Sequence, residues 1–383
     1  MKSAKWAWVL LLASMPLLNG CTGFWDAPSS SGSTTTKLTS GVFYVLNIGT
    51  SQIVAYYVNS GTLTKIATYS TPGSFTPITL TVAPSNDFLY LSTTGGIYLY
   101  TISSGGTLTL GNSSGVISTD TAYSMQVDST GQWLVEAISG YADVYAIPLS
   151  TSTGKPTSTT EQYLALPGSS IQQLTISPDN SYVFVAMGTS GTEAIPFTSS
   201  SSNPFGTGKN IAVTGSGGAA LSVAVDPTDR LLYIGETAAT SGTNTGGLRV
   251  FKFSTLAEIT GSPFASGGLA PYSILPISTG SYVYVANRQT ASGSTGLIKG
   301  FTVASSGSTY TLTALSSTFS PGTNTVALAE DSSDQFVFAV SVGGSYDLTG
   351  YIFDTSSAGT LDTVIQSSTG TDPVQAGAIA AAH

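Results

Sequence analysis

Four ionisable residues follow strongly apolar segments, in positions where we expect exposed loops, and could carry out hydrolysis: Glu136, Glu236, Arg288 and Asp347. A carboxylate such as Glu136 or Glu236 can act as a general base on a water molecule. Arg288 can bind a substrate carboxylate or stabilise a developing oxyanion. Because only 8% of the residues are charged, these four are the first candidates for catalysis. The alternative is that they are solvated loop residues or members of weak ion pairs.

Uncharged residues at similar points of the sequence are candidates for ligand binding. They are Asn47, Tyr123, Tyr272, Asn287 and Tyr346. The asparagines follow strongly apolar segments, and the tyrosines lie near expected strand starts or in loops. Tyrosine rings can stack on sugars or peptides, although packing between strands also uses them.

The composition excludes several classes of function. Lys and Arg contribute 11 residues against 20 acidic ones, and the net charge of -9 argues against nucleic-acid binding. With one Cys and one His, neither a disulfide framework nor a His/Cys zinc site can form. We therefore expect no metal and no cofactor. A histidine-dependent triad is not expected either, because the single histidine is the last residue, His383.

The N-terminal 39 residues predict export and a lipid anchor. Residues 1–20 combine a basic start with a short apolar run, as signal peptides do. Leu18-Asn19-Gly20-Cys21 resembles the bacterial lipobox, which implies cleavage before Cys21 and lipid attachment to its thiol. Residues 21–39 are rich in Ser, Thr and Gly and predict a flexible tether. The expected location is the cell envelope, and Thr22, in place of an inner-membrane retention Asp, favours the outer membrane.

A repeat after residue 40 predicts the fold. Each copy contains an alternating apolar segment, a polar turn, a strongly apolar strand, a further strand and a polar hairpin. The strongly apolar strands begin 45 to 54 residues apart, at Phe88, Trp133, Tyr182, Leu231, Tyr282 and Phe336. This spacing is typical of a four-stranded propeller blade. We expect residues 40–383 to form an all-β, seven-bladed β-propeller of four-stranded antiparallel blades.

The seventh blade is divided between the two ends of this region. Val42-Phe43-Tyr44-Val45 supplies a strongly apolar strand that no inner strand precedes. A matching segment is present at the other end, from Pro373 to Ile379. We expect this C-terminal strand to complete the N-terminal blade, which closes the ring and leaves only short strand edges.

Short motifs in the blades resemble those of a known propeller family. Tyr44-Val45-Leu46-Asn47 and Tyr284-Val285-Ala286-Asn287 resemble the YVTN-type repeat. The pattern from Asp226 to Tyr233 is similar to the blades of the seven-bladed lactonase family, which includes 6-phosphogluconolactonase-like proteins. That family has a catalytic histidine at the start of an inner strand, but the corresponding stretch of this chain, Ala122 to Gly131, contains none. We therefore assign no catalytic residue from the resemblance.

Three functions are compatible with these residues. In the first, a lipid-anchored propeller binds a partner protein or an envelope glycan at the mouth of its central channel, without catalysis. In the second, suggested by the resemblance, the protein hydrolyses lactones with its loop carboxylates and Arg288. In the third, it is a repeat scaffold in an envelope assembly. The lack of a histidine within the propeller favours the first.

Overall fold

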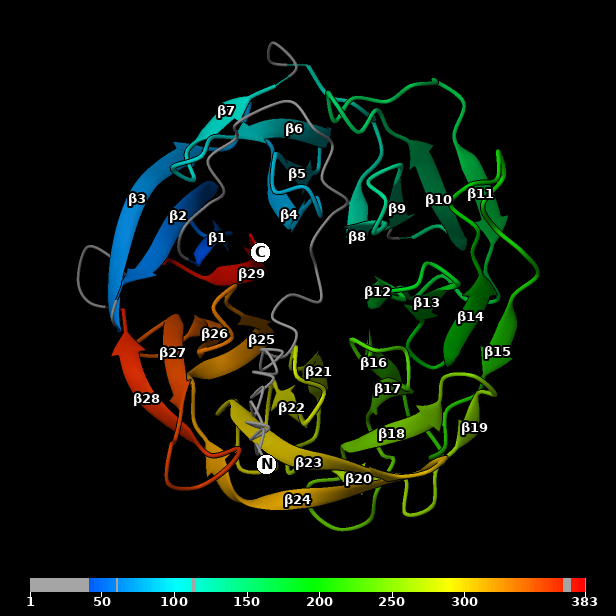
Figure 1. The fold of residues 1–383 in the computed structure, drawn as a ribbon, viewed down its shortest axis with the longest axis vertical. Coiled ribbons are helices and arrows are strands. Elements are labelled where there is room, and N and C mark those ends of the chain that lie inside the picture. Colours follow the sequence, from blue (N-terminus) through cyan, green and yellow to red (C-terminus); the bar gives the residue numbers. More distant parts are fainter. Residues whose placement is uncertain (1–40, 60, 112–114, 139, 368–372, 383) are drawn as a thin grey trace, which may run out of the picture. The chain divides into compact units, whose positions relative to one another are not determined.

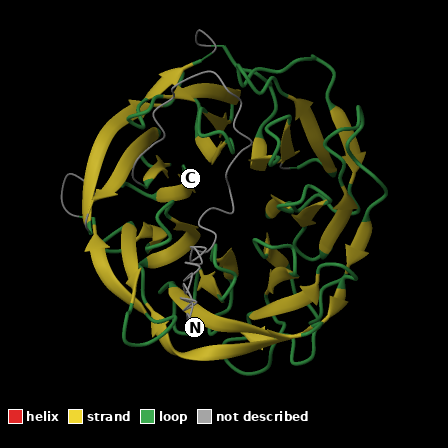
Figure 2. Cartoon of the chain, viewed as in Figure 1, coloured by secondary structure: helices red, strands yellow, loops and turns green. Residues whose placement is uncertain are grey.

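The computed structural model describes residues 41–59, 61–111, 115–138, 140–367 and 373–382. The signal peptide, Cys21 and the tether lie outside these residues. Within them, strands alone form the regular structure, in seven sheets arranged as blades around a centre (Figures 1 and 2). None of the described segments forms a helix of the length and hydrophobicity that a membrane crossing needs. The predicted seven-bladed β-propeller is confirmed.

Each blade runs from an inner strand at the centre of the ring to an outer strand at its edge. Blade 1 contains, in that order, β29 (Ala376–Ala381), β1 (Val42–Asn47), β2 (Gln52–Asn59) and β3 (Thr62–Ser70). Blade 2 contains β4 (Pro77–Val82), β5 (Phe88–Thr93), β6 (Gly96–Ile102) and β7 (Leu108–Leu110). Blade 3 contains β8 (Ala122–Val127), β9 (Trp133–Ile138), β10 (Asp143–Pro148) and β11 (Gln162–Ala165). Blade 4 contains β12 (Gln173–Ile176), β13 (Tyr182–Ala186), β14 (Thr192–Pro196) and β15 (Lys209–Ile211).

The remaining blades follow the same order. Blade 5 contains β16 (Ala220–Val225), β17 (Leu231–Glu236), β18 (Gly247–Lys252) and an outer edge divided into β19 (Ala257–Glu258) and β20 (Phe264–Ala265). Blade 6 contains β21 (Pro271–Pro276), β22 (Tyr282–Asn287), β23 (Leu297–Ser306) and β24 (Thr309–Phe319). Blade 7 contains β25 (Thr323–Glu330), β26 (Phe336–Gly343), β27 (Leu348–Phe353) and β28 (Leu361–Gln366). Pro263 lies between β19 and β20, and it has no N–H with which to continue a ladder.

The ring closes within blade 1, as the sequence predicts. β29 pairs antiparallel with β1, with Val45 opposite Ile379, and lies beside it at the inside of the ring (Figure 1). The segment that leads into β29 is held against blade 7 by a hydrogen bond of 2.7 Å, in which the Gln375 N–H donates to Asp347 Oδ2. Closure therefore depends on hydrogen bonds between segments from opposite ends of the propeller.

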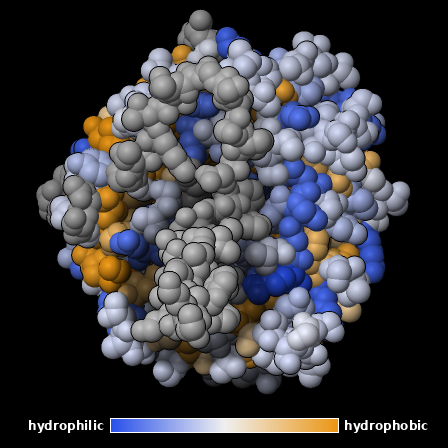
Figure 3. Space-filling model, viewed as in Figure 1, coloured by the Kyte–Doolittle hydropathy of each residue, from blue (hydrophilic) through white to orange (hydrophobic). Residues whose placement is uncertain are grey.

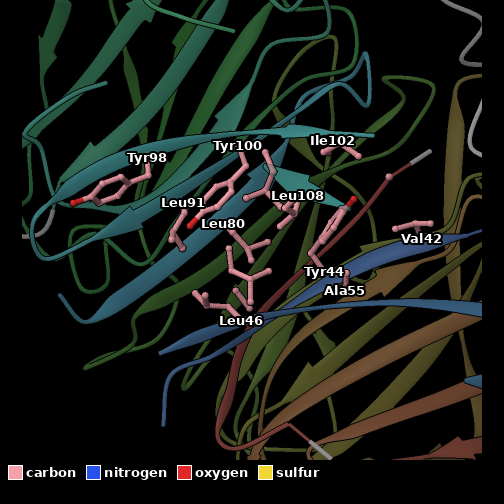
Figure 4. Close-up of a cluster of buried hydrophobic side chains, with 14 residues drawn as sticks. Val42, Tyr44, Leu46, Ala55, Leu80, Leu91, Tyr98, Tyr100, Ile102 and Leu108 are labelled. Carbon is pink, nitrogen blue, oxygen red and sulfur yellow. The ribbon is translucent and has the colours of Figure 1, made fainter. Parts of the chain in front are cut away.

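The core consists of seven apolar layers between neighbouring blades. Alternate residues of each second strand point to opposite neighbours, because strand side chains alternate in direction. One central position faces the following blade and is aromatic in six of the seven blades, with residues Tyr44, Tyr90, Val135, Phe184, Tyr233, Tyr284 and Phe338. Figure 4 shows the layer between blades 1 and 2, where Tyr44 lies among the side chains of both.

Three of these tyrosines also connect blades by a hydrogen bond. The hydroxyl of Tyr44 donates to the Gly106 carbonyl at 3.0 Å, and that of Tyr90 donates to the Gly154 carbonyl at 2.8 Å. Tyr284 repeats the contact, with its hydroxyl donating to a backbone carbonyl of blade 7. Each acceptor lies in the outer hairpin of the following blade, so the tyrosine fixes both the spacing and the rotation of adjacent blades.

We expect Tyr90→Phe to lower the free energy of unfolding by about 1 to 2 kcal/mol, because the Gly154 carbonyl loses its donor. Tyr233→Phe is the matched control. Tyr233 occupies the equivalent position, but its buried hydroxyl has no hydrogen-bond partner among the described residues, so its removal should leave stability unchanged or raise it. Denaturant unfolding measures both variants, and equal losses in the two would contradict this role for the hydroxyl.

Candidate functional site

At one end of the ring, which we call its mouth, the inner strands carry β-bulges. In the described residues, six inner strands shift register against the second strand near their N-terminal ends. The extra residues of these bulges are Ile78, Tyr123, Leu221, Tyr272, Val326 and Gly377. Each is partly or well exposed. A bulge re-aims the side chain it carries, and bulges are common beside binding sites.

Two of these residues meet across the centre of the ring. The hydroxyls of Tyr123, in β8, and Tyr272, in β21, lie 3.2 Å apart. β12 and β16 separate their strands around one side of the ring, and β25, β29 and β4 separate them around the other. The guanidinium carbon of Arg288 lies 5.1 Å from the centre of the Tyr272 ring. Burial and the contact with Tyr123 raise the pKa of Tyr272, which therefore stays a neutral hydroxyl.

Tyr123, Tyr272 and Arg288 form what we call the mouth cluster. It offers a partly exposed aromatic ring, a phenol donor and a cation within one small area. Aromatic faces stack on sugar rings, and a guanidinium can bind a carboxylate or hydroxyl groups. Polar or near-neutral residues make up most of the surface visible in Figure 3, with hydrophobic residues in small groups between them. The cluster is therefore suited to a polar ring ligand.

Glu236 has a different setting from the one predicted. It is the last residue of β17 and is fully buried, so its assignment to an exposed loop is wrong. Its Oε1 accepts a hydrogen bond of 2.8 Å from Arg249 Nη1, and its Oε2 accepts one from the Thr214 N–H at 3.0 Å. Arg249 also forms two hydrogen bonds with Glu258. These contacts hold β17, β18 and β19 together, and they occupy the carboxylate that we expected to activate water.

Three further candidates are also buried. Asn287 is buried in β22, where its side chain accepts a hydrogen bond from Ser266 Oγ and donates one to the Ser266 carbonyl. Asp347, in the loop between β26 and β27, accepts a hydrogen bond from the Gln375 N–H, just before β29. Asn47 ends β1 and is buried with its amide oxygen unpartnered among the described residues. The expectation that these residues lie exposed at the mouth is therefore wrong, whereas Tyr346 does lie in a loop and is partly exposed.

Glu136 belongs to a second group of residues, between blades 2 and 3. It lies within β9 and is fully buried, so its assignment to a loop is also wrong. Carboxylate oxygens of Asp120, Glu136 and Glu161 all lie within 4.8 Å of one another. Ser118 Oγ donates to Asp120 Oδ2 at 3.0 Å and has a longer contact of 3.4 Å with Glu161 Oε1. We call these four residues the carboxylate cluster.

The electrostatics of the carboxylate cluster follow from burial and mutual repulsion. Burial, followed by the charges of Asp120 and Glu161, raises the pKa of Glu136 well above its usual range. Burial and the charge of Asp120 raise the pKa of Glu161 to about 7. Paired carboxylates of this kind can serve as general acid and base, but a substrate must reach them. Glu136 is 0% exposed, which argues against direct chemistry on a substrate.

Asp120 and Glu161 were not among the residues predicted from the sequence, because they lie in connecting segments that carry no motif. One signal was available. Glu136 interrupts the otherwise apolar strand Trp133–Ile138, at a point where aligned blades have aliphatic residues.

Comparisons with known proteins support the fold. No protein-family model matches the chain, and no curated protein matches it. Among solved structures, the periplasmic gluconolactonase of Pseudomonas aeruginosa is 15% identical, with a TM-score of 0.66, over 90% of this chain and 99% of that one. A candidate 6-phosphogluconolactonase from Bacteroides uniformis is 15% identical, with a TM-score of 0.68, over 89% of this chain and 99% of that one.

The fold is that of the lactonase-like propellers. A candidate 6-phosphogluconolactonase from Bacteroides fragilis gives the same result, with 14% identity and a TM-score of 0.66 over 92% of this chain and 100% of that one. The resemblance inferred from Asp226 to Tyr233 is therefore confirmed at the level of architecture. At these identities a shared architecture carries no activity with it.

We expect Arg249→Met to lower the free energy of unfolding by about 3 to 5 kcal/mol, because it leaves Glu236 as a buried charge without its cation. The double variant Arg249→Met with Glu236→Gln should recover part of this loss, since it removes both charges. Thermal or denaturant unfolding measures the effect. A single variant as stable as the parent would show that Glu236 does not need Arg249.

Proposed function

We propose that this protein is a lipid-anchored envelope propeller that binds a saccharide at the mouth cluster and does not catalyse a reaction on it. The contact of Tyr123 with Tyr272 across the centre of the ring, with Arg288 against the Tyr272 ring, carries this proposal. The net charge of -9 works against dense polyanions. A saccharide with few charges, bound by ring stacking and by Arg288, fits this balance best.

The surroundings of the predicted catalytic carboxylates support binding over hydrolysis. Glu236 is paired with Arg249, Asp347 accepts the Gln375 N–H, and Glu136 is enclosed between two blades. A general base must lie within hydrogen-bond reach of the water it activates. Each of these carboxylates is instead held within the framework of the propeller.

Anchoring is supported by the sequence around Cys21. The sole cysteine follows a short apolar run and the Leu-Asn-Gly tripeptide, and the following Ser/Thr/Gly segment would hold the propeller away from the bilayer. One structural neighbour is a periplasmic protein, which is consistent with an envelope location. Under this proposal the lipid attaches to Cys21, and the membrane is the outer one.

A second candidate function is hydrolysis of a sugar lactone. The names of the gluconolactonase-like neighbours favour it, and a sugar lactone is also a polar ring that the mouth cluster could accept. The two proposals differ in turnover and agree on the place of binding.

Binding is tested by calorimetry with a panel of neutral and uronic oligosaccharides and gluconolactones. We expect Tyr272→Ala and Arg288→Gln each to weaken binding by about 10-fold, because each loses a stacking or cation contact. Tyr141→Ala is the control, since this tyrosine is 62% exposed and lies in the turn between β9 and β10. Full-strength binding by both mouth variants would overturn the proposal. Lactone turnover that both variants abolish would favour the hydrolase.

Anchoring is tested with Cys21→Ser. The change removes the thiol that the lipid would occupy, so we expect loss of lipid labelling and release of the protein from membranes. Labelled lipid incorporation and membrane fractionation measure these effects. Continued membrane attachment of the unlabelled variant would place the anchor elsewhere.

A further inference from the structure

Glu136 is an exception in the repeat. One position of each second strand, next to the aromatic position, faces the preceding blade. Its occupants are Val45, Leu91, Glu136, Val185, Ile234, Val285 and Ala339. All seven are at most 1% exposed, and Glu136 alone is polar. The fold therefore does not require a carboxylate at this position, and an aliphatic residue serves the other six blades.

The Glu136 carboxylate has no donor to balance its burial. Neither of its oxygens accepts a hydrogen bond from an N–H or hydroxyl donor among the described residues, and the side chain that it meets, Asp120, is another carboxylic acid. Burying a charge without a partner is costly, and proteins commonly balance such a group with an opposite charge or a metal ion. The other buried carboxylate in a second strand, Glu236, has Arg249 as its partner. A cation is the partner that the surroundings of Glu136 lack.

The neighbours of Glu136 bring further negative oxygens to the same point. Asp120 and Glu161 direct carboxylate oxygens to within 4.8 Å of one another and of Glu136, and Ser118 adds a hydroxyl. Three carboxylates at this separation repel one another unless one of them takes up a proton or a positive charge lies between them. A bound cation would remove this repulsion without the proton.

We propose that the carboxylate cluster binds one calcium ion between blades 2 and 3. Calcium prefers carboxylate, hydroxyl and water oxygens, and two of its ligands on opposite sides lie about 4.6 to 5.2 Å apart. Carboxylate oxygens that all lie within 4.8 Å of one another can surround an ion of this size. Magnesium needs shorter bonds in a regular octahedron and keeps most of its water. All of the side-chain atoms in the cluster that could bind a metal ion are oxygens, which disfavours zinc and copper.

The ion would join two blades. Ser118 and Asp120 lie in the connection from β7 to β8, and the Ser118 carbonyl accepts a hydrogen bond of 2.9 Å from the Ile97 N–H of β6. Glu136 belongs to β9, and Glu161 directly precedes β11. Calcium would therefore tie the connection, which is already paired with blade 2, to the second and outer strands of blade 3. Its effect should be on propeller stability, independent of any ligand at the mouth cluster.

The test uses the full-length protein in detergent, after removal of bound ions with EGTA. We expect calcium to bind with one ion per chain and to raise the midpoint of thermal unfolding by about 5 °C at 100 times its dissociation constant. Glu136→Gln should abolish calorimetric calcium binding and this shift. Asp120→Asn, at a more exposed position, should weaken both and serves as a second variant. Terbium luminescence provides a separate measurement, sensitised by Tyr145, which is paired with Glu136 in the sheet.

The matched control is Glu330→Gln. Glu330 is also a buried glutamate between blades, but its oxygens accept hydrogen bonds from Ser278, so this variant should retain the full calcium response. If Glu136 instead shares a proton with Asp120, calcium will change neither the heat signal nor the midpoint, and the proposal is overturned. Calcium binding that persists in both Glu136→Gln and Asp120→Asn would place the ion elsewhere. A stronger response to magnesium than to calcium would contradict the choice of ion.

Discussion

The antiparallel pairing of β29 with β1 joins segments from the two ends of the propeller within one sheet, and every other blade depends on it. Each blade buries both of its faces against neighbours, and β29 contributes Ala378 and Ala376 to the apolar layers on the two sides of blade 1, so loss of this pairing would disturb both layers. Asp347, which receives the Gln375 N–H, secures the segment that enters this pairing. A residue first considered for catalysis thus contributes to closure.

The apolar layers restrict where polar groups can lie. Strands that are buried on both faces have few positions for a charge, which explains why only 8% of the chain is charged. Two glutamates, Glu136 and Glu236, nevertheless lie in second strands. Glu236 is neutralised by Arg249 from the adjacent strand, whereas Glu136 meets two more carboxylates. The same physical demand, that a buried charge needs a partner, is met by a protein side chain in blade 5 and, we propose, by an ion in blade 3.

The mouth of the ring is subject to a different constraint. Inner strands must bend where they converge, and the repeated bulge allows them to do so while it directs one residue per bulge toward the opening. In blades 3 and 6 that residue is tyrosine, and the two rings reach across to each other. The binding site that we propose at the mouth therefore depends on the geometry of closure, with side-chain identity varying from blade to blade.

The sequence by itself determined the seven blades, their order and the closing strand. Strand alternation, turn residues and a repeat of near-constant length are local properties, and a segment such as Val42 to Val45 is recognisable without its partner. Tertiary structure alone decided which side chains meet. Tyr123 and Tyr272 are 149 residues apart, and Asp120 and Glu161 approach Glu136 from two different connections. From the sequence, the second strands are expected to end before Glu136 and Glu236, which places both residues in loops. The structure shows them buried, since the curvature of the ring and the packing of neighbouring blades determine whether a residue near a strand end faces water or the next sheet.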